Sequence, residues 1–536
     1  MQTRNSAHDA LAQQRVMVQS LAAPACYPHP AAAVSLVETH ISFVLLAGEF
    51  AYKIKKAVDL DFLDFSTLAR RRFFCEEELR LNRRLAPQLY LDVVAIGGSP
   101  QSPQLGGDGP AIDYAVKMAR FPQECLAERV LARGELQAAA IDALAVAVAT
   151  FHDGIARAGT DDAYGSAAAI AAPAEQNFAQ IRALLGAGED AAGLSAVAAR
   201  TLAEQARLAE RFEARRGGGF VRECHGDLHL GNIVLYGNAP CIFDCIEFNP
   251  NLRWIDVMNE AAFLVMDLEV RGRADLASRF LNGYLEAGGD YAGLPLLAWY
   301  KAYRAMVRAK VARIRAAQGG LAAAERAAAL ADYRRYLDYA SLAMAPPSRR
   351  GLLLTHGFSG SGKSHFAHVL VEHLGAVRIR SDVERKRLHG LGALMRSGSG
   401  LETGIYAQQA TEETYGRMES LARSVAQAGM TVIVDATFLK RRQRDRFRAA
   451  AQALDLPFAI LDCRAPEALL RERLARRQQA AADASEATAA VLDSQLRDAE
   501  ALAADEMAFV VPVDAADGAW APAFAEIERR LRTRTP

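Results

Sequence analysis

The order of apolar and polar residues divides the chain into two parts with different rhythms. Behind residue 350, short apolar runs alternate with amphipathic stretches, and at least one such stretch separates each pair of runs. This alternation predicts an α/β domain, in which a parallel sheet has helices on both faces. The predicted strands are Leu352–His356, Val377–Arg380, Thr431–Asp435, Phe458–Asp462 and Phe509–Val513.

Ahead of residue 345 the apolar runs come early and helical periodicity follows. A turn at Ala47–Gly48 joins the first two runs, and the chain from Leu126 onward is predicted to be mostly helical, apart from a strand-rich stretch at Phe220–Ile246. The pattern predicts an α+β domain with a small β-rich lobe and a larger helical lobe. The glycine-containing stretches 97–109 and 217–219 are predicted to be flexible connectors. The predicted strands of the small lobe are His40–Leu46, Glu49–Lys55, Val93–Gly97 and Tyr114–Met118.

Two adjacent prolines mark the clearest domain boundary. Neither Pro346 nor Pro347 can continue the long helical stretch before them, and an apolar strand follows. With 536 residues, the chain is also too long for a single core. We therefore predict a tail at 1–25, a first domain at 26–344, a linker at 345–350 and a second domain at 351–536.

Composition and charge narrow the class of protein. Lys plus Arg equals Asp plus Glu, so a whole-protein basic field for nucleic acid is absent. Basic segments at 440–444 and 304–315 leave an RNA or protein partner open, although solvated helix faces explain both more simply. The seven cysteines are scattered without C-x-x-C spacing, which is typical of a cytoplasmic protein. No run approaches the ~20 apolar residues that span a bilayer, so no membrane association is expected, and the pattern indicates no oligomeric state.

The segment 357–364 fits the phosphate-binding pattern G-x-x-x-x-G-K-[ST], between a predicted strand and a predicted helix. Its glycines let backbone N–H groups turn toward phosphate oxygens, and the helix adds the positive end of its dipole. Lys363, also assigned to catalysis, would reach the β- and γ-phosphates of ATP, and the Ser364 hydroxyl would hold Mg²⁺. The predicted nucleotide-binding residues of this loop are Gly357, Ser359, Gly360, Ser361, Gly362, Lys363 and Ser364.

Two aspartates follow predicted strands of the same domain. The carboxyl ends of parallel strands face one crevice, which places Asp382 and Asp435 opposite the phosphates. Asp382 is a candidate catalytic base for an acceptor hydroxyl, and Asp435 is a candidate metal-binding group or a group that orients the acceptor. A helix cap is the structural alternative for either residue.

Arg473 and Arg477 lie four positions apart on a predicted helix and share one face. They would bind the transferring phosphate as a lid, or they belong to a solvated helix face. Together with the P-loop, the Ser-Asp pair at 381–382 and the Val-Asp-Ala-Thr run at 434–437, they resemble the P-loop kinases that include gluconate kinases, polynucleotide 5′-kinases and zeta toxins. The resemblance covers about residues 350–536 and implies ATP-dependent phosphorylation, without identifying an acceptor.

A second motif lies in the first domain. Residues 224–233 read Cys-His-Gly-Asp-Leu-His-Leu-Gly-Asn-Ile, and a predicted hairpin leads from them to Asp244. The hairpin is predicted to bring Asp227, Asn232 and Asp244 together. Phosphoryl transfer needs a carboxylate that takes the acceptor's proton, together with an amide oxygen and a second carboxylate that hold Mg²⁺. A His-Gly-Asp turn in an unrelated fold is the alternative.

The pattern H-G-D-x-x-x-x-N resembles aminoglycoside phosphotransferases and choline-type kinases, whose fold is protein-kinase-like. This resemblance covers about residues 30–340. It implies that Asp227 is the catalytic base and that Asn232 and Asp244 bind metal. The chain departs from the pattern of kinases at two points, because a glycine-rich phosphate loop is missing and Cys-Ile follows Asp244 in place of Phe-Gly.

The small lobe supplies further candidates for binding ATP. Lys53 and Lys55 alternate along a predicted strand and so point to one face. Glu78 lies on the apolar stripe of a helix predicted at 73–86, where a carboxylate needs a cation, although a surface glutamate is the alternative. A kinase fold holds the α- and β-phosphates with a strand lysine paired to a helix glutamate, and we favour Lys53 over Lys55 for that pair. Met118 would lie in the hinge that reads adenine.

These motifs together predict two ATP-dependent phosphotransferase domains in tandem, each acting with Mg²⁺ on a hydroxyl group of a small molecule. The alternative is a single active P-loop kinase or ATPase whose kinase-like front domain is a regulatory binding module. The sequence identifies neither acceptor, and it leaves open whether the two sites act in sequence.

Overall fold

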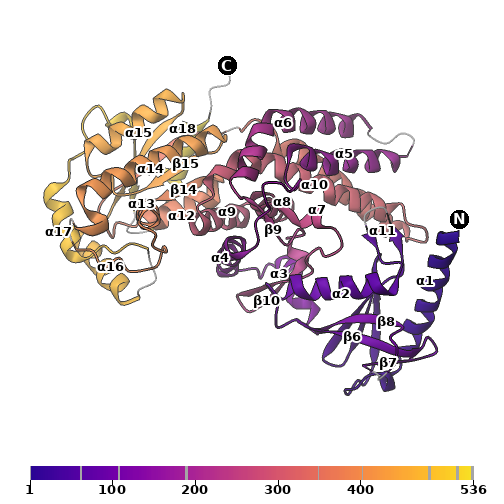
Figure 1. Ribbon diagram of the computed structural model, residues 1–536. Helices are drawn as coiled ribbons and strands as arrows, with labels where there is room; N and C mark the ends of the chain where they lie inside the picture. The colour runs from indigo at the N-terminus through magenta and orange to yellow at the C-terminus, as the bar shows by residue number, and fades with distance from the viewer. Residues whose placement is uncertain are drawn as a thin grey trace. The chain divides into compact units, whose positions relative to one another are not determined.

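The computed structural model describes residues 2–60, 63–106, 109–186, 191–347, 349–400, 403–480, 484–514, 518 and 520–532. The chain, coloured by residue number in Figure 1, forms two compact units, each made of two stretches of the sequence. The first contains Met1–Gln180 and Ala198–Asp267, and the second contains Ile181–Val197 and Leu268–Pro536.

The first unit is built on a six-stranded antiparallel sheet with the strand order β1-β2-β3-β8-β6-β7. Alternate residues of β2 and β3, such as Leu45 and Ile54, are buried in a core cluster on one face of the sheet. The strands are β1 (Val34–Glu38), β2 (Ser42–Ala47), β3 (Phe50–Lys55), β6 (Tyr90–Ser99), β7 (Ser102–Leu105) and β8 (Asp113–Ala119), and a separate pair consists of β4 (Asp59–Leu60) and β5 (Leu63–Asp64).

The small lobe is larger than its apolar runs predict. Residues 97–109, predicted to be a connector, contain β7, which pairs with the end of β6. Only Pro103 and Leu105 of this strand are buried, so no apolar run in the sequence predicts it. The first 25 residues, predicted to be a tail, contain helix α1 (Gln2–Ser20), and Met17 and Leu21 are buried in the same cluster as β2 and β3.

A helix and a larger helical region complete the first unit. Helix α2 (Leu68–Asn82) begins earlier than predicted because the Thr67 hydroxyl accepts a hydrogen bond from the N–H of Arg70 and caps it. The other helices are α3 (Ala127–Ala132), α4 (Ala138–Gly154), α5 (Ala167–Ala183), α6 (Ala191–Gly217), α7 (Pro250–Arg253) and α8 (Val257–Val270), three of which extend into the second unit. The strands of this region are β9 (Val221–Glu223), β10 (Ile233–Tyr236), β11 (Ala239–Ile242) and β12 (Trp254–Asp256).

The second unit contains the parallel sheet that the sequence predicts. Its strand order is β14-β15-β13-β16-β17, and all four strand pairs are parallel. Leu353 of β13 lies in a buried cluster with residues of α12 and α18, and α14 packs on β14 and β15 (Figure 1). The strands are β13 (Leu352–His356), β14 (Val377–Arg380), β15 (Val432–Asp435), β16 (Phe458–Arg464) and β17 (Val510–Asp514). The helices are α9 (Ala274–Gly288), α10 (Leu294–Ala316), α11 (Ala323–Ala343), α12 (Lys363–Leu374), α13 (Ser381–Leu388), α14 (Gln408–Gln427), α15 (Arg441–Ala453), α16 (Glu467–Ala480), α17 (Ala489–Asp498) and α18 (Ala521–Leu531).

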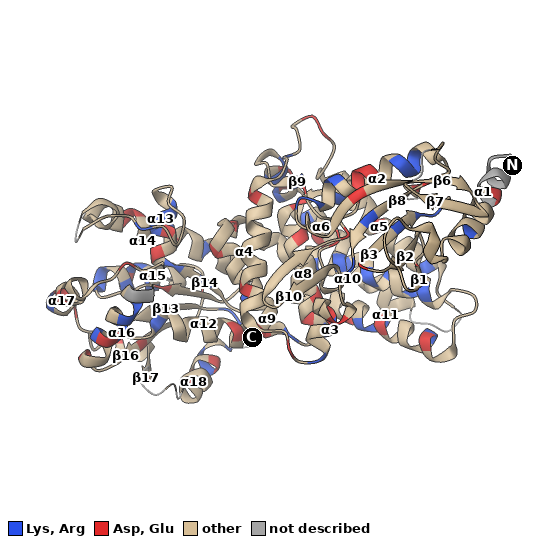
Figure 2. Ribbon diagram, turned by 90° about the horizontal axis from the view of Figure 1, so that it is seen from below, with Lys and Arg blue, Asp and Glu red and all other residues tan. Residues whose placement is uncertain are grey.

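Charges of both signs are interspersed along the ribbon in Figure 2. In the basic segment 440–444, Arg441 pairs with Asp505 at 2.7 Å and Arg444 pairs with Glu506 at 2.6 Å, so these cations already have carboxylate partners. Among the described helices, none combines the length and the apolarity that crossing a bilayer requires.

Candidate active sites

The P-loop leads from β13 into α12 through backbone conformations that only glycine adopts easily. Gly357, Gly360 and Gly362 have φ values of 133°, 86° and 89°. A Cβ atom at Gly360 would lie 2.8 Å from the carbonyl oxygen of Leu470, so a larger residue does not fit there. Since Lys363 is the first residue of α12, the positive end of this helix lies at the loop.

A cavity of about 530 Å³ lies at this loop. Gly357, Ser361 and Arg473 are not among the residues that line it, but the Nη1 atom of Arg473 donates a hydrogen bond to the carbonyl oxygen of Gly360 at 3.3 Å. Eight predicted site residues line the cavity: Ser359, Gly360, Gly362, Lys363, Ser364, Asp382, Asp435 and Arg477.

Lys363 and Asp435 are buried in the wall of this cavity. Burial lowers the pKa of Lys363, and Asp435 opposes that shift. The ammonium group donates to the carbonyl oxygen of Phe358 at 2.7 Å, which leaves it further donors for phosphate oxygens. The Oδ2 atom of Asp435 is buried without a hydrogen-bond partner among the described residues, whereas Thr355 donates to Oδ1 at 3.4 Å. A buried carboxylate oxygen without a donor suits a metal ion or its water shell, so these residues fit Mg²⁺.

Asp382 lies in the first turn of α13, just after β14 ends at Arg380. The N-cap position of α13 belongs to Arg380, and no side-chain capping bond forms there. The structure therefore places Asp382 at the cavity, and the predicted role of this carboxylate as a base remains a prediction.

Two contacts of the P-loop have no signal in the sequence. Gln495 of α17 accepts a hydrogen bond from the N–H of Ser359 at 2.8 Å and donates to its hydroxyl at 3.0 Å. His356, which precedes the loop, bonds to Asp462 of the neighbouring strand β16 at 2.7 Å. Burial acts to raise the pKa of Asp462, but hydrogen bonds from His356 and Arg464 lower it. Both partners are far from the loop in the sequence and become visible only when the sheet and α17 are in place.

The second motif forms a compact site in the first unit. The amide nitrogen of Asn232 donates to the Asp227 carboxylate and to its carbonyl oxygen, both at 3.0 Å, which fixes the two side chains against each other. The N–H of Phe243 donates to the carbonyl oxygen of Asn232 at 3.0 Å, which brings the next residue, Asp244, to the same end of the β10–β11 hairpin. The hairpin thus brings the three predicted residues to one place. Asp244 has φ 63°, a left-handed conformation that is uncommon for aspartate.

A buried glutamate, which the sequence analysis missed, holds the loop that carries Asp227. Glu260 of α8 accepts hydrogen bonds from the N–H groups of His225 and Gly226 at 3.0 and 2.6 Å, and from His152 at 3.1 Å. Burial acts to raise the pKa of Glu260, but the bond from His152 and the charges around it hold the pKa at about 2. The Glu260 carboxylate therefore holds the backbone of the turn before Asp227 in place.

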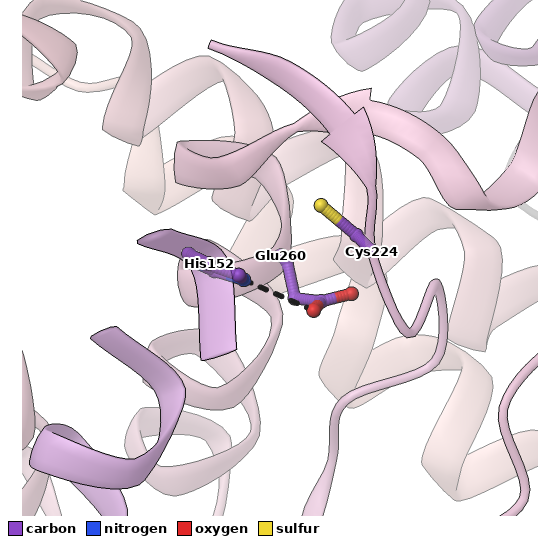
Figure 3. A group of neighbouring side chains, drawn as sticks. All are labelled: His152, Cys224 and Glu260. Atoms are coloured by element: carbon purple, nitrogen blue, oxygen red, sulfur yellow. Dashed lines mark hydrogen bonds and ion pairs between the residues drawn. The ribbon is translucent and has the colours of Figure 1, made fainter. Parts of the chain in front are cut away.

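Figure 3 shows Glu260 between His152 and Cys224, a set of side chains with the types and spacing of a metal site. Both carboxylate oxygens of Glu260 already accept the bonds described above. The Cys224 thiol donates to the carbonyl oxygen of Ile255 at 3.5 Å, and burial raises its pKa, which disfavours the thiolate that a metal needs. His152, Cys224 and Glu260 are therefore best explained as a hydrogen-bonded structural cluster.

The predicted Lys–Glu pair is part of a larger network of charges. Glu78 binds both lysines, with Lys53 at 2.8 Å and Lys55 at 2.6 Å. Lys53 also contacts Asp244 at 2.6 Å, and Lys55 contacts Glu247, a residue without a signal in the sequence. Burial acts to lower the pKa of Lys53, but the carboxylates of Asp244 and Glu78 raise it well above its ordinary value. The choice between the two lysines is thus not exclusive, because each takes one oxygen of Glu78.

A cavity of about 930 Å³ lies beside this network. Lys53 and Asp244 line it, and so does Met118, the predicted hinge residue at the end of β8. The turn after β2 contributes Gly48, whose φ is 58°. Glu78, Lys55, Asp227 and Asn232 are not among the lining residues. The cavity is large enough for a nucleotide, and its wall includes a lysine and an aspartate.

Comparisons with known proteins agree with this division of the chain. Residues 68–300 match the family model described as phosphotransferase enzyme family, and residues 352–502 match the model described as AAA domain. The two matches confirm the predicted order of a protein-kinase-like phosphotransferase domain followed by an α/β P-loop domain.

One relative aligns with nearly the whole chain. The chain is 32% identical over 479 residues to the uncharacterized protein Rv2004c of Mycobacterium tuberculosis, and the alignment covers 88% of this chain and 93% of that protein. The uncharacterized protein Mb2027c of Mycobacterium bovis matches with the same values. The pairing of the two domains is thus shared with these proteins.

Solved structures resemble each part separately. Amicoumacin kinase hAmiN in complex with AMP-PNP, Ca²⁺ and Ami is 13% identical with a TM-score of 0.38, and the match covers 61% of this chain and 93% of that chain. A gluconokinase from Sinorhizobium meliloti is 23% identical with a TM-score of 0.24, and the match covers 35% of this chain and 91% of that chain.

Proposed function

We propose that this chain, which belongs to the family of the mycobacterial proteins Rv2004c and Mb2027c, is a tandem ATP-dependent kinase with two active sites. Each site would transfer the γ-phosphate of ATP to a hydroxyl group of a small molecule. The observation that carries this proposal is that each unit has a cavity of its own, lined by a lysine and by at least one carboxylate suited to phosphoryl transfer: Asp382 and Asp435 at the back, Asp244 at the front.

At the back site, the N–H groups of the P-loop and Lys363 would hold the phosphates of ATP. Ser364 and Asp435 would hold Mg²⁺, which when bound neutralises charge on the β- and γ-phosphates. Asp382 would take the proton of the acceptor hydroxyl as its oxygen forms a bond to the γ-phosphorus and the bond to the bridging oxygen of ADP breaks. Arg477 faces the cavity and would stabilise the charge on the transferring phosphoryl group.

At the front site, Asp227 would be the base and Asn232 and Asp244 would hold Mg²⁺. Lys53 would bind the α- and β-phosphates while Glu78 fixes it from behind. The acceptor oxygen bonds to the γ-phosphorus, the bond to ADP breaks, and the proton passes to Asp227. Its carboxylate is partly exposed, with a side-chain exposure of 34%, so an acceptor can reach it.

We propose the domain order that the sequence predicts, with a linker at 345–350 and a P-loop domain at 351–536, and with the phosphotransferase domain, predicted at 26–344, extended to include helix α1. The matched segments 68–300 and 352–502 lie within these limits. We also propose a cytoplasmic location, because all seven cysteines are free thiols and five of them are buried, as is usual for a reducing compartment.

A second function is favoured by one observation at the front site. Asp244, the carboxylate proposed to hold metal, is bonded to Lys53 at 2.6 Å. If this bond persists with nucleotide bound, the front domain is a regulatory nucleotide-binding module and the P-loop site is the single catalytic centre.

One experiment separates the two proposals. ATP turnover and the number of bound nucleotides are measured for the full chain, for Lys363→Ala and for Asp227→Ala. A tandem kinase binds two nucleotides, and each variant loses a different part of the turnover. A regulatory front domain leaves turnover unchanged in Asp227→Ala and abolished in Lys363→Ala. Turnover that neither substitution reduces would contradict both proposals.

A further inference from the structure

Helix α9 packs on the P-loop domain, although its sequence belongs to the match with the phosphotransferase family. The match runs through residue 300, whereas the whole stretch Leu268–Pro536 belongs to the second compact unit. Asn282 of α9 donates to the carbonyl oxygen of Ala376 at 2.9 Å and accepts from the N–H of Arg378 at 2.7 Å. These backbone groups belong to β14 and the residue before it, at the edge of the parallel sheet, where strand groups lack a neighbour. One side chain of α9 therefore completes the edge of the sheet.

One helical turn further along α9, Glu286 binds two arginines of the same strand. Its carboxylate contacts Arg380 at 2.7 Å and Arg378 at 3.1 Å. The three side chains are only 22%, 16% and 9% exposed, so little water screens them. Burial acts to raise the pKa of Glu286, but the two guanidinium groups lower it and keep the carboxylate charged.

Both arginines lead from Glu286 into the back site. Arg380 lines the cavity together with Asp382. Arg378 donates from Nη1 to the carbonyl oxygen of Ser364 at 3.1 Å, in the first turn of α12. Ser364 is the residue proposed to hold Mg²⁺ through its hydroxyl, so the carboxylate of Glu286 is linked through one side chain to the start of the P-loop helix.

We propose that Glu286 is a positioning residue of the P-loop site, which holds Arg378 against the first turn of α12 and Arg380 in the wall of the cavity. This inference rests on the proposed function of the back site. It means that the working P-loop unit includes α9, so a helix from the phosphotransferase sequence is needed by the second active site. The tandem arrangement then has a physical basis in the back site itself.

The test uses the full chain with Asp227→Ala, so that turnover reports the back site. In this background, Glu286→Gln keeps the size of the side chain and removes its charge. We expect kcat for ATP turnover to fall about tenfold while the KM for ATP changes less than about threefold, because the nucleotide still meets the P-loop but the reacting groups are misplaced.

Glu269→Gln is the matched control. Glu269 lies in the same unit, contacts Lys301 at 2.9 Å and is 25% exposed, close to the 22% of Glu286. We expect kcat in this variant to stay within about twofold of the background. A Glu286→Gln variant that behaves like Glu269→Gln would overturn the inference.

A second measurement separates positioning from general loss of stability. If Glu286 acts through Arg378, both substitutions disrupt the same contacts between Glu286, Arg378 and α12. The double variant Glu286→Gln/Arg378→Gln then has about the same kcat as the less active of the two single variants. Losses that multiply would contradict the proposal. If Glu286→Gln does not fold, Glu286→Asp is the variant to measure, because it keeps the negative charge. We expect Glu286→Asp to retain at least about a third of the kcat of the Asp227→Ala background. A folded Glu286→Asp protein that loses as much kcat as expected for Glu286→Gln would refute positioning by charge.

Failure of the proposed function looks different. If the back site is not a kinase, Lys363→Ala does not reduce the ATP turnover of the Asp227→Ala background, and this result is seen before any change at Glu286 is made.

Discussion

Replacing Glu78 by glutamine tests whether the buried network of charges holds the front lobe together. Glu78 is fully buried and lies between Lys53 and Lys55. The substitution keeps the shape of the side chain and one acceptor oxygen, but it leaves two buried lysines with less negative charge around them. Removing one partner of a buried ion pair is costly because the other charge loses its compensation.

The lowered pKa of Glu78 and the usual cost of breaking a buried ion pair indicate the order of magnitude of the effect. Burial acts to raise the pKa of Glu78, yet Lys53 and Lys55 hold it at about 2, against 4.5 for an ordinary glutamate. At about 1.4 kcal/mol for each pKa unit, this difference corresponds to about 3 kcal/mol of stability at neutral pH. Breaking a buried pair costs about 3–5 kcal/mol, and the lower end applies because Asp244 and Glu247 remain beside the lysines.

Calorimetry of the full chain measures this effect as a shift of the transition in which the first unit unfolds. For a unit of this size, about 3 kcal/mol lowers the midpoint by about 6–12 °C. Hydrogen exchange of peptides from β3 and α2 assigns the shift to the lobe that carries Glu78, because local opening exposes their amides.

The dependence on pH has a definite sign. The pKa of Glu78 is lower in the folded state than in the unfolded state, so its contribution is complete above the unfolded value of 4.5 and is lost as the pH falls toward about 2. The difference between the original chain and Glu78→Gln therefore shrinks as the pH falls from about 4.5 toward about 2.

Glu76→Gln is the control on the same helix. Glu76 pairs with Arg72 at 2.8 Å, and its side chain is 53% exposed, so water screens the pair. We expect this change to move the midpoint by less than about 1 °C. Equal shifts for Glu78→Gln and Glu76→Gln, or a shift for Glu78→Gln that does not depend on pH between 5 and 2, would refute the reasoning.

Two further predictions concern the loops that carry the chemistry. Gly360→Ala is expected to weaken nucleotide binding at the back site at least about tenfold, because the backbone has φ 86° and a Cβ atom would lie 2.8 Å from a carbonyl oxygen. Titration of the Asp227→Ala background with an ATP analogue measures this affinity. An unchanged affinity would contradict the assignment of the loop. In the Lys363→Ala background, Asn232→Ala is expected to raise the Mg²⁺ concentration for half-maximal front-site turnover about tenfold. Asn232→Asp keeps an oxygen ligand, so we expect a much smaller rise in that Mg²⁺ concentration. An unchanged Mg²⁺ requirement in Asn232→Ala would exclude Asn232 as a ligand.

The features that the sequence predicts well are those coded by neighbouring residues. The P-loop is eight consecutive residues between a strand and a helix, and the structure keeps that order in β13, the loop and α12. The motif from His225 to Asn232 is equally local, and the hairpin that follows it spans few residues. Parallel strands are fully buried, so each appears as an apolar run that needs no knowledge of its neighbours.

The features that the sequence does not predict depend on distant partners. Gln495 meets Ser359 from 136 positions away, and Asn282 meets Ala376 from 94 positions away. In each case an amide on an ordinary amphipathic helix replaces a missing backbone partner, and such a residue looks like any polar position on a helix surface. Strand β7 was missed for a different reason, since half of its side chains face solvent and its pairing with β6 provides its definition.

The conformation of Asp244 bears on whether the front site is catalytic. Its φ of 63° costs free energy for a residue with a Cβ atom, and such strain persists only where the surroundings enforce it. Here the N–H of Asp244 donates to the hydroxyl of Tyr90 at 3.2 Å, and the side chain reaches Lys53. These two contacts hold the turn after β11 in place. Lys53 also keeps Glu78 as a partner, so the lysine can release Asp244 without becoming an unpaired buried cation. If the front site is a kinase as proposed, we expect the Asp244 carboxylate to exchange Lys53 for a metal ion when ATP binds.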